Sequence, residues 1–140
     1  RTGRLNVTKT HYQVPNAAPA PATARYSHCV KVGEWLYVTG QLPVDPDNPD
    51  APLPGDIKSQ TELSFRNLER ILAHVGYEFA DTVFARVYLA NFERDYPGFN
   101  EVYLRYYDAD ETLPGRTTVG VAKLARDALV EVDLVLYREA

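Results

Sequence analysis

Arg116 and Glu131 are residues of the types that bind and activate small carboxylate compounds. Arg116 lies in residues 113–122 and Glu131 in residues 129–136, and both segments alternate aliphatic or β-branched residues with polar ones. This period of two predicts a pair of strands. Because the connection, residues 123–128, is short, we expect the strands to form an antiparallel hairpin. A guanidinium on one strand would then face a carboxylate on its neighbour, and the pair could bind a small carboxylate substrate.

The rest of the chain supplies the elements that must position this pair. Asp56 is a good helix N-cap, apolar residues then recur at helical spacing, and Gly76 supplies the stop. Gly33 suits the turn of a β-hairpin. The predicted elements, in chain order, are strands at 26–32 and 35–39, a helix at 56–75, a strand at 82–90, a helix at 95–107 and strands at 113–122 and 129–136, with residues 5–12 alternating enough for one more, peripheral strand.

Two helices this amphipathic need one sheet face to cover, which predicts an α+β sandwich. The other face carries apolar side chains that are unsuited to water, so we expect another subunit to bury it. These side chains are Tyr37, Tyr88, Val135 and Tyr137. Residues 1–24, rich in Ala, Pro, Thr and Asn, are expected to form an extended, irregular N-terminal segment, and residues 25–140 a single domain.

Composition and motifs narrow the classes of function. A chain of 140 residues that is 45% apolar fits one domain with one core, and its net charge of −4 argues against a nucleic-acid partner. No apolar run approaches the length of a membrane span. Cys29 is the only cysteine, so no internal disulfide can form, and a reducing compartment is expected. We expect no metal, because His11, His28 and His74 lack ligand spacing and the aspartates of loop 43–55 lack that of a calcium site.

A series of short motifs runs along residues 25–137. They are Arg25-Tyr26-Ser27, Val32-Gly33, Tyr37-Val-Thr-Gly-Gln41, Gly55-Asp-Ile57 with Gln60-Thr61, Asn67-Leu68, Asn100-Glu-Val-Tyr103, Pro114-Gly-Arg116-Thr-Thr-Val119 and Val130-Glu-Val-Asp133. Each is weak alone. In this order and spacing they resemble the YjgF/YER057c/UK114 family, also called the Rid (reactive intermediate deaminase) family.

The resemblance implies a chorismate-mutase-like α+β fold, a mixed sheet with two helices packed on one face. It implies assembly as a homotrimer, with clefts between neighbouring subunits. It also implies a hydrolase, without metal or cofactor, that converts enamine and imine acids of the 2-aminoacrylate type to 2-oxo acids and ammonia. We expect the protein to be cytoplasmic, in keeping with the reducing compartment that the single cysteine indicates. Such an enzyme would act as a 2-iminobutanoate/2-iminopropanoate deaminase.

The resemblance also implies roles for individual residues. Arg116 matches the position that pairs with the substrate carboxylate. Glu131 matches a carboxylate that positions the attacking water, together with backbone carbonyls near Gly40 and Thr118, and a carboxylate can also pass protons. Tyr26 matches a tyrosine of the cleft and is a candidate proton donor. The positions that would contact the substrate are therefore Arg116, Tyr26, Thr39, Gly40, Asn100 and Thr118.

Taken singly, these residues have ordinary alternatives. Arg116 could be a surface salt-bridge partner, and Glu131 an exposed strand carboxylate paired with a lysine. Tyr26 could belong to the core or an interface. Asn100, which matches an asparagine that closes or supports the pocket, could merely cap the second helix.

Departures from the family pattern leave the substrate open. Residues 24–27 read Ala-Arg-Tyr-Ser where Gly-Pro-Tyr-Ser is common, which adds the cation of Arg25 at the cleft entrance. Thr118 occupies a position where a cysteine is frequent in the family. This change should have little effect if the backbone carbonyl of residue 118, rather than its side chain, positions the water. Two further hypotheses follow: a non-catalytic protein that binds 2-oxo acids, and a pathway-specific relative that acts on another unstable imine, such as an aminomuconate-like compound.

Overall fold

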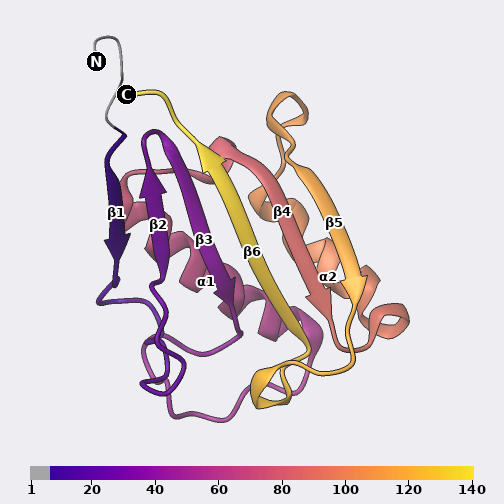
Figure 1. Ribbon diagram of the computed structural model, residues 1–140. Coiled ribbons are helices and arrows are strands. Elements are labelled where there is room, and N and C mark those ends of the chain that lie inside the picture. The colour runs from indigo at the N-terminus through magenta and orange to yellow at the C-terminus, as the bar shows by residue number, and fades with distance from the viewer. Residues whose placement is uncertain (1–6) are drawn as a thin grey trace, which may run out of the picture.

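The computed structural model describes residues 7–140, and its elements follow the predicted order with the extra N-terminal strand (Figure 1). The strands are β1 (Lys9–Tyr12), β2 (Cys29–Val32), β3 (Trp35–Gln41), β4 (Thr82–Leu89), β5 (Gly115–Gly120) and β6 (Val130–Tyr137). The helices are α1 (Ile57–Val75) and α2 (Phe92–Tyr106), with short 3-10 helices η1 (Phe79–Asp81), η2 (Asp110–Thr112) and η3 (Ala125–Asp127). No helix within residues 7–140 is long and apolar enough to cross a membrane. The peripheral strand is confirmed at 9–12, and the part of that prediction on residues 5–6 lies outside the described residues.

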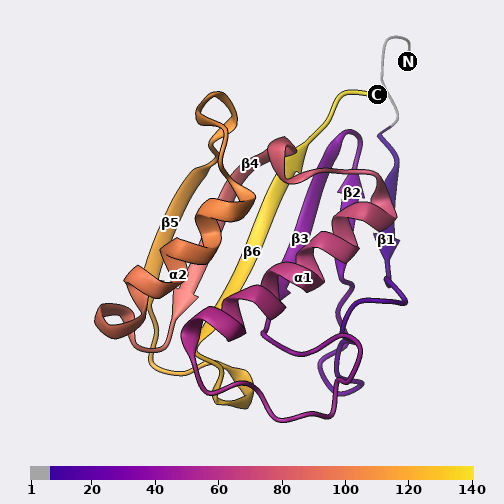
Figure 2. The same cartoon turned by 180° about the vertical axis from the view of Figure 1, so that it is seen from behind.

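The strands form one six-stranded sheet in the order β1-β2-β3-β6-β4-β5. All neighbours are antiparallel except β4 and β5, which are parallel, so the predicted mixed sheet is confirmed. Figure 2 shows α1 and α2 together in front of the sheet, whereas Figure 1 shows the opposite face bare. The hydrophobic core therefore lies between the helices and one sheet face.

The predicted hairpin of the last two strands is wrong. β4 lies between β5 and β6, because Ala85 is opposite Arg116 in one pairing and Arg86 is opposite Asp133 in the other. The connection, residues 121–129, passes the end of β4 (Figure 1), so β5 and β6 run in opposite directions without pairing. β4, α2 and β5 instead form a strand–helix–strand unit, in which a crossover helix joins two parallel strands.

α1 has the predicted bounds. Asp56 accepts a hydrogen bond from the backbone N–H of Ser59 at 2.9 Å, and Gly76 ends the helix with a φ of 86°. The apolar face of α1 is buried against the sheet, as the helical spacing predicts. Its largest buried side chains are Phe65, Leu68, Ile71 and Leu72.

α2 begins earlier than predicted. It starts at Phe92 rather than Asp95, because Asn91 caps it by accepting a hydrogen bond from the backbone N–H of Arg94 at 3.3 Å. Residues 92–94 are exposed, so this part of the first turn carries no apolar stripe that would reveal a helix. The apolar residues on which the prediction rests are buried as expected, namely Phe99, Val102 and Tyr103.

The N-terminal segment belongs to the domain. β1 pairs with β2, and Val14 and Ala17 are buried in the core. Residues 13–24 are irregular, as predicted, but no boundary in packing separates residues 7–24 from the remainder.

The bare face of the sheet carries exposed aromatic side chains. Trp35 and Tyr37 are 40% and 50% exposed, and the Tyr137 ring lies 4.9 Å from that of Trp35. Tyr88 and Val135, also predicted for this face, are partly exposed. A face of this composition is suited to contact with another protein surface.

Candidate functional site

The Arg116 side chain lies between β5 and α2, on the helix-covered face of the sheet. Its Nε donates to Thr118 Oγ1 at 2.8 Å, and its Nη2 donates to Asn100 Oδ1 at 2.7 Å. Its Cζ lies 4.5 Å from the ring centroid of Tyr103 and 5.2 Å from that of Phe99, within the range of cation–π attraction. These contacts hold the guanidinium in one orientation. We call Arg116, Thr118 and Asn100 the arginine cluster.

The arginine cluster suits a carboxylate ligand. None of the ion pairs within residues 7–140 includes Arg116, and its two protein acceptors are neutral. Burial raises the pKa of Tyr103, with the Arg116 charge opposing that rise, so Tyr103 stays neutral beside the cation. Asn100 lies inside α2 rather than at its cap. The remaining guanidinium N–H groups can bind a planar carboxylate.

Glu131 lies on the bare face of the sheet, on β6, beside Gly40 of β3. A Cβ atom at residue 40 would overlap the Glu131 carboxylate, so this close approach requires glycine. The β3–β6 register shifts between Val38 and Gln41, and this irregularity includes Gly40. Tyr26 is close enough for the Glu131 charge to affect its pKa. We call Glu131, Gly40, Tyr26 and Thr39 the glutamate cluster.

Glu131 differs from Asp133, the next residue on the same face, in how its charge is compensated. Asp133 accepts hydrogen bonds from Arg86 Nε and from the Tyr88 hydroxyl, both at 2.8 Å. Glu131 takes part in none of the ion pairs within residues 7–140, so the alternative of a lysine partner finds no support there. Burial, followed by the charge of Asp133, raises the pKa of Glu131. A carboxyl with a raised pKa is suited to proton exchange with water.

Tyr26 and Thr39 complete the glutamate cluster in different ways. Tyr26 is 38% exposed, and partial burial together with the Glu131 charge raises its pKa. Its hydroxyl therefore remains protonated at neutral pH and can donate a hydrogen bond. The Thr39 hydroxyl donates to the Ser27 carbonyl at 2.6 Å, so it fixes the segment next to Tyr26.

The two clusters do not meet within one chain. Arg116 is opposite the core residue Ala85 and points to the helix-covered face, whereas Glu131 is opposite Tyr88 and points to the bare face. The expectation that Arg116 faces Glu131 is therefore wrong. Alternation assigns side chains to the two faces of their own strand, but the relation between strands depends on their pairing.

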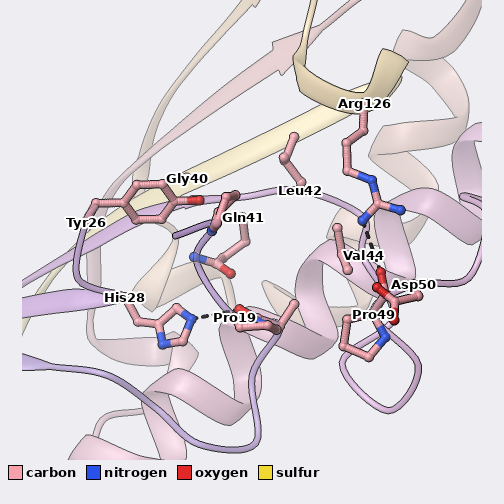
Figure 3. A pocket seen from close by; sticks show the side chains of 12 residues that line it. Pro19, Tyr26, His28, Gly40, Gln41, Leu42, Val44, Pro49, Asp50 and Arg126 are labelled. Carbon is pink, nitrogen blue, oxygen red and sulfur yellow. Dashed lines mark hydrogen bonds between the residues drawn. The ribbon is translucent and has the colours of Figure 1, made fainter. Parts of the chain in front are cut away.

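A pocket of about 210 Å³ opens beside the glutamate cluster (Figure 3). Tyr26 and Gly40 line it, together with the N-terminal segment and residues 43–55, which we call the proline-rich loop. His28, which is 3% exposed, anchors the N-terminal segment where residues 18–21 form one wall of the pocket. Its Nδ1 accepts from the Val14 N–H at 2.8 Å and its Nε2 donates to the Ala18 carbonyl at 2.7 Å. The sequence motifs include neither His28 nor any residue of this wall.

Asn67 of α1 joins two walls of the pocket. Its Oδ1 accepts from the Ala18 N–H at 2.8 Å, and its Nδ2 donates to the carbonyls of Val44 at 2.7 Å and Leu63 at 3.1 Å. Asn67 occurs in one of the family motifs, but no role was expected for it. Asn67 is a polar residue within the apolar stripe of α1, and this position is the sequence signal that indicates a structural role for its side chain.

Replacing Asn67 with alanine is expected to lower the free energy of unfolding by about 2–3 kcal/mol, because it leaves buried backbone groups without partners. Chemical denaturation at one fixed protein concentration measures this change. Asn48→Ala, in the exposed part of the proline-rich loop, is the matched control and should change stability by less than about 0.5 kcal/mol. Equal effects of the two substitutions would contradict the bridging role of Asn67.

Sequence and structure together define the class of protein. The chain is a small α+β protein whose residues 16–137 match the family described as Endoribonuclease L-PSP. It belongs to this family, and the resemblance to the YjgF/Rid family is confirmed. A RutC family protein of Pyrococcus horikoshii is 37% identical over 122 residues, 87% of this chain and 93% of the relative. The Escherichia coli protein named putative reactive intermediate deaminase TdcF is 30% identical over 120 residues, 85% of this chain and 91% of the relative.

Solved structures show the same fold. Yeast Mmf1 superposes with a TM-score of 0.84 at 32% identity, over 94% of this chain and all of its own. Escherichia coli TdcF, solved with bound serine, superposes with a TM-score of 0.83 at 27% identity, over 93% of this chain and 99% of its own. The fold therefore binds a small amino acid in at least one relative.

Proposed function

We propose that this protein hydrolyses reactive enamine and imine acids of the 2-aminoacrylate type to 2-oxo acids and ammonia. The observation that carries the proposal is the complementarity of the two clusters. One presents an oriented guanidinium with only neutral acceptors, and the other a partly buried carboxylate outside the ion pairs of residues 7–140. The name of TdcF, a putative reactive intermediate deaminase, supports the same class of reaction.

We further propose that the site is completed between copies of the chain, in a homotrimer of chorismate-mutase-like subunits. The two clusters lie on opposite faces of one sheet, so a single copy cannot present both to one small molecule. The bare face, with its exposed Trp35 and Tyr37, supplies a surface for association. In a closed ring, the arginine cluster of each copy would meet the glutamate cluster of the next, which makes all sites equivalent.

In the proposed reaction, Arg116 binds the substrate carboxylate through two parallel N–H···O bonds. An enamine first gains a proton on carbon and becomes the imine. Water held by Glu131 attacks the C=N carbon: the C–O bond forms, the C=N π bond breaks, and a water proton passes to the Glu131 carboxylate. The nitrogen gains a proton, with the Tyr26 hydroxyl as a candidate donor that Glu131 can afterwards reprotonate. The amino alcohol then expels ammonia as the C=O bond forms, so water supplies the oxygen and no oxidant is needed.

An endoribonuclease activity, which the description of the family names, fits the two clusters less well than imine hydrolysis does. The chain has a net charge of −4, whereas nucleic-acid proteins normally present several cations to the phosphates. The arginine cluster offers one guanidinium, bounded by aromatic rings. Its geometry suits a single planar carboxylate.

The direct test is to generate 2-aminoacrylate from serine with a pyridoxal-phosphate-dependent dehydratase and to follow its decay to pyruvate. We expect the rate to rise in proportion to the concentration of this protein. Thermal stabilisation by pyruvate or 2-oxobutyrate without faster imine decay would instead support the non-catalytic hypothesis. Hydrolysis confined to aminomuconate-like imines in a wider screen would support the pathway-specific hypothesis.

Catalysis is expected to depend on the ionised form of Glu131. Because its pKa is raised, kcat should fall as pH decreases through a value above that of an ordinary carboxyl group. The contribution of Glu131 to the free energy of unfolding changes with pH in the opposite direction to kcat. It is present below the pKa that Glu131 has in the unfolded chain, and it is lost as pH rises through the higher pKa of the folded protein. A kcat profile from about pH 4 to pH 8 measures the acid limb.

Asp133→Asn tests the cause of that limb. It removes the second contribution to the raised pKa of Glu131, so the acid limb should move to lower pH. Asp47→Asn is the control, because it removes a carboxylate of the proline-rich loop that does not contribute to the raised pKa of Glu131. An acid limb that stays in place in Asp133→Asn would argue against Glu131 as the titrating group.

A further inference from the structure

The side chains that line the pocket beside the glutamate cluster differ in chemistry between its two ends. Figure 3 shows Tyr26 near Gly40 at one end and Arg126 with Asp50 at the other, with Leu42 and Val44 between them. The first end belongs to the proposed reaction site. The far end has no part in the reaction described above.

Arg126, in η3, is held against the proline-rich loop by two backbone carbonyls of that loop. Its Nη1 donates to Pro49 O and its Nη2 to Ala51 O, both at 3.2 Å, so the guanidinium contacts the residues on either side of Asp50. Arg126 and Asp50 nevertheless form no ion pair among those of residues 7–140. The far end therefore offers N–H donors and a carboxylate acceptor that do not satisfy each other.

Backbone strain marks both ends of the same pocket. Within residues 7–140, the non-glycine residues with positive φ are Arg25, Arg126 and Asp127, at 55°, 59° and 54°. Arg25 precedes Tyr26 at the reaction end, and the other two lie at the far end. A left-handed conformation costs an arginine about 1 kcal/mol or more, whereas an aspartate adopts it more readily, and strained residues cluster at binding sites.

The middle of the pocket is lined mainly by apolar side chains, with the Gln41 amide beside them (Figure 3). Pro19, Leu42 and Val44 supply its walls. The hydrogen bonds of His28 and Asn67 anchor the segments that carry Pro19 and Val44. A chain of methylene groups fits along Pro19, Leu42 and Val44, and the charged groups of Arg126 and Asp50 at the far end suit a polar terminal group.

We propose that this pocket binds the side chain of an extended 2-imino acid that ends in a carboxamide. The carboxamide oxygen would accept from Arg126 and its N–H would donate to Asp50, while the methylene groups lie along Leu42 and Val44. This assignment rests on the proposed function, since the imine end must lie at Tyr26 and Gly40. It makes the protein selective for amide-bearing imino acids over purely apolar ones.

The test compares imines that an L-amino-acid oxidase produces from glutamine, norleucine and alanine. Wild-type protein should hydrolyse the glutamine-derived imine with a higher kcat/KM than the norleucine-derived one. Arg126→Asn, which tolerates the left-handed backbone, and Asp50→Ala should each reduce that preference about tenfold. Turnover of the alanine-derived imine should change less than about twofold, because its side chain does not reach the far end.

Lys123→Gln is the matched control, since it removes a cation three residues from Arg126 that does not line the pocket. It should leave the preference unchanged. The proposal is overturned if the wild-type protein shows no preference for the amide, or if both pocket variants retain that preference. It is also overturned if Arg126→Asn slows the hydrolysis of all imines equally, because Arg126 would then only stabilise the proline-rich loop.

A separate readout distinguishes this proposal from the proposed function. If wild type hydrolyses none of the imines, deamination fails, and the pocket is then judged by calorimetric binding of the corresponding 2-oxo acids. Tighter binding of the amide-bearing acid, lost in Arg126→Asn and Asp50→Ala, would still support the pocket. Equal affinity for the amide-bearing and alkyl acids would overturn it.

Discussion

Arg116→Ala is expected to lower kcat/KM for 2-aminoacrylate hydrolysis by about a thousandfold, because the substrate loses its only charged anchor in the proposed site. The fold should survive, since Arg116 is only half-buried and its partners, Thr118 and Asn100, can bond to water. Arg116→Lys should also be strongly impaired. A lysine keeps the charge but lacks the planar fork that binds both carboxylate oxygens and packs against Tyr103.

The control for this experiment is Arg105→Ala. Arg105 also lies on α2, where it forms an exposed ion pair with Glu62 at 3.0 Å. Its loss should leave kcat/KM and the oligomeric state unchanged, because exposed pairs contribute little. Activity of Arg116→Ala close to that of wild type would refute the assignment of this residue as the carboxylate anchor.

Mixing two inactive variants is expected to restore activity, because in the proposed trimer the two clusters of one site come from different copies. Arg116→Ala retains an intact glutamate cluster, and Glu131→Gln retains an intact arginine cluster. After joint unfolding and reassembly of equal amounts, about a quarter of the sites should combine two intact clusters. Each variant alone should have very low activity, so the recovered rate is a clear signal.

The control mixture combines Arg116→Ala with the double variant Arg116→Ala, Glu131→Gln. No copy in it carries an intact arginine, so activity should stay at the background rate whatever the mixing ratio. Absence of recovery in the first mixture, with mixed assemblies demonstrated by mass spectrometry, would show that the two clusters do not act in one site.

The helices and strands, and most of their order, could be predicted from the amino-acid sequence. Asp56 and Gly76 bound α1 because capping depends on local backbone geometry, and the alternation along residues 130–136 identifies β6 because side chains point to opposite faces in turn. The motifs also placed the chain in its family. All these signals are local along the chain, or are compared residue by residue.

The distribution of the chemical groups over the two faces of the sheet became known from the fold. The insertion of β4 between β5 and β6 places Arg116 and Glu131 on opposite faces, and no periodicity within either strand reports which strand lies beside it. The far end of the pocket likewise joins Arg126 to a loop about 75 residues earlier through backbone carbonyls, which every residue type possesses. Strand pairing and backbone contacts over such separations depend on the packing of the whole chain. The sequence pattern therefore predicts the helices, the strands and the candidate site residues, whereas the packing determines which of these residues lie close enough to share a site.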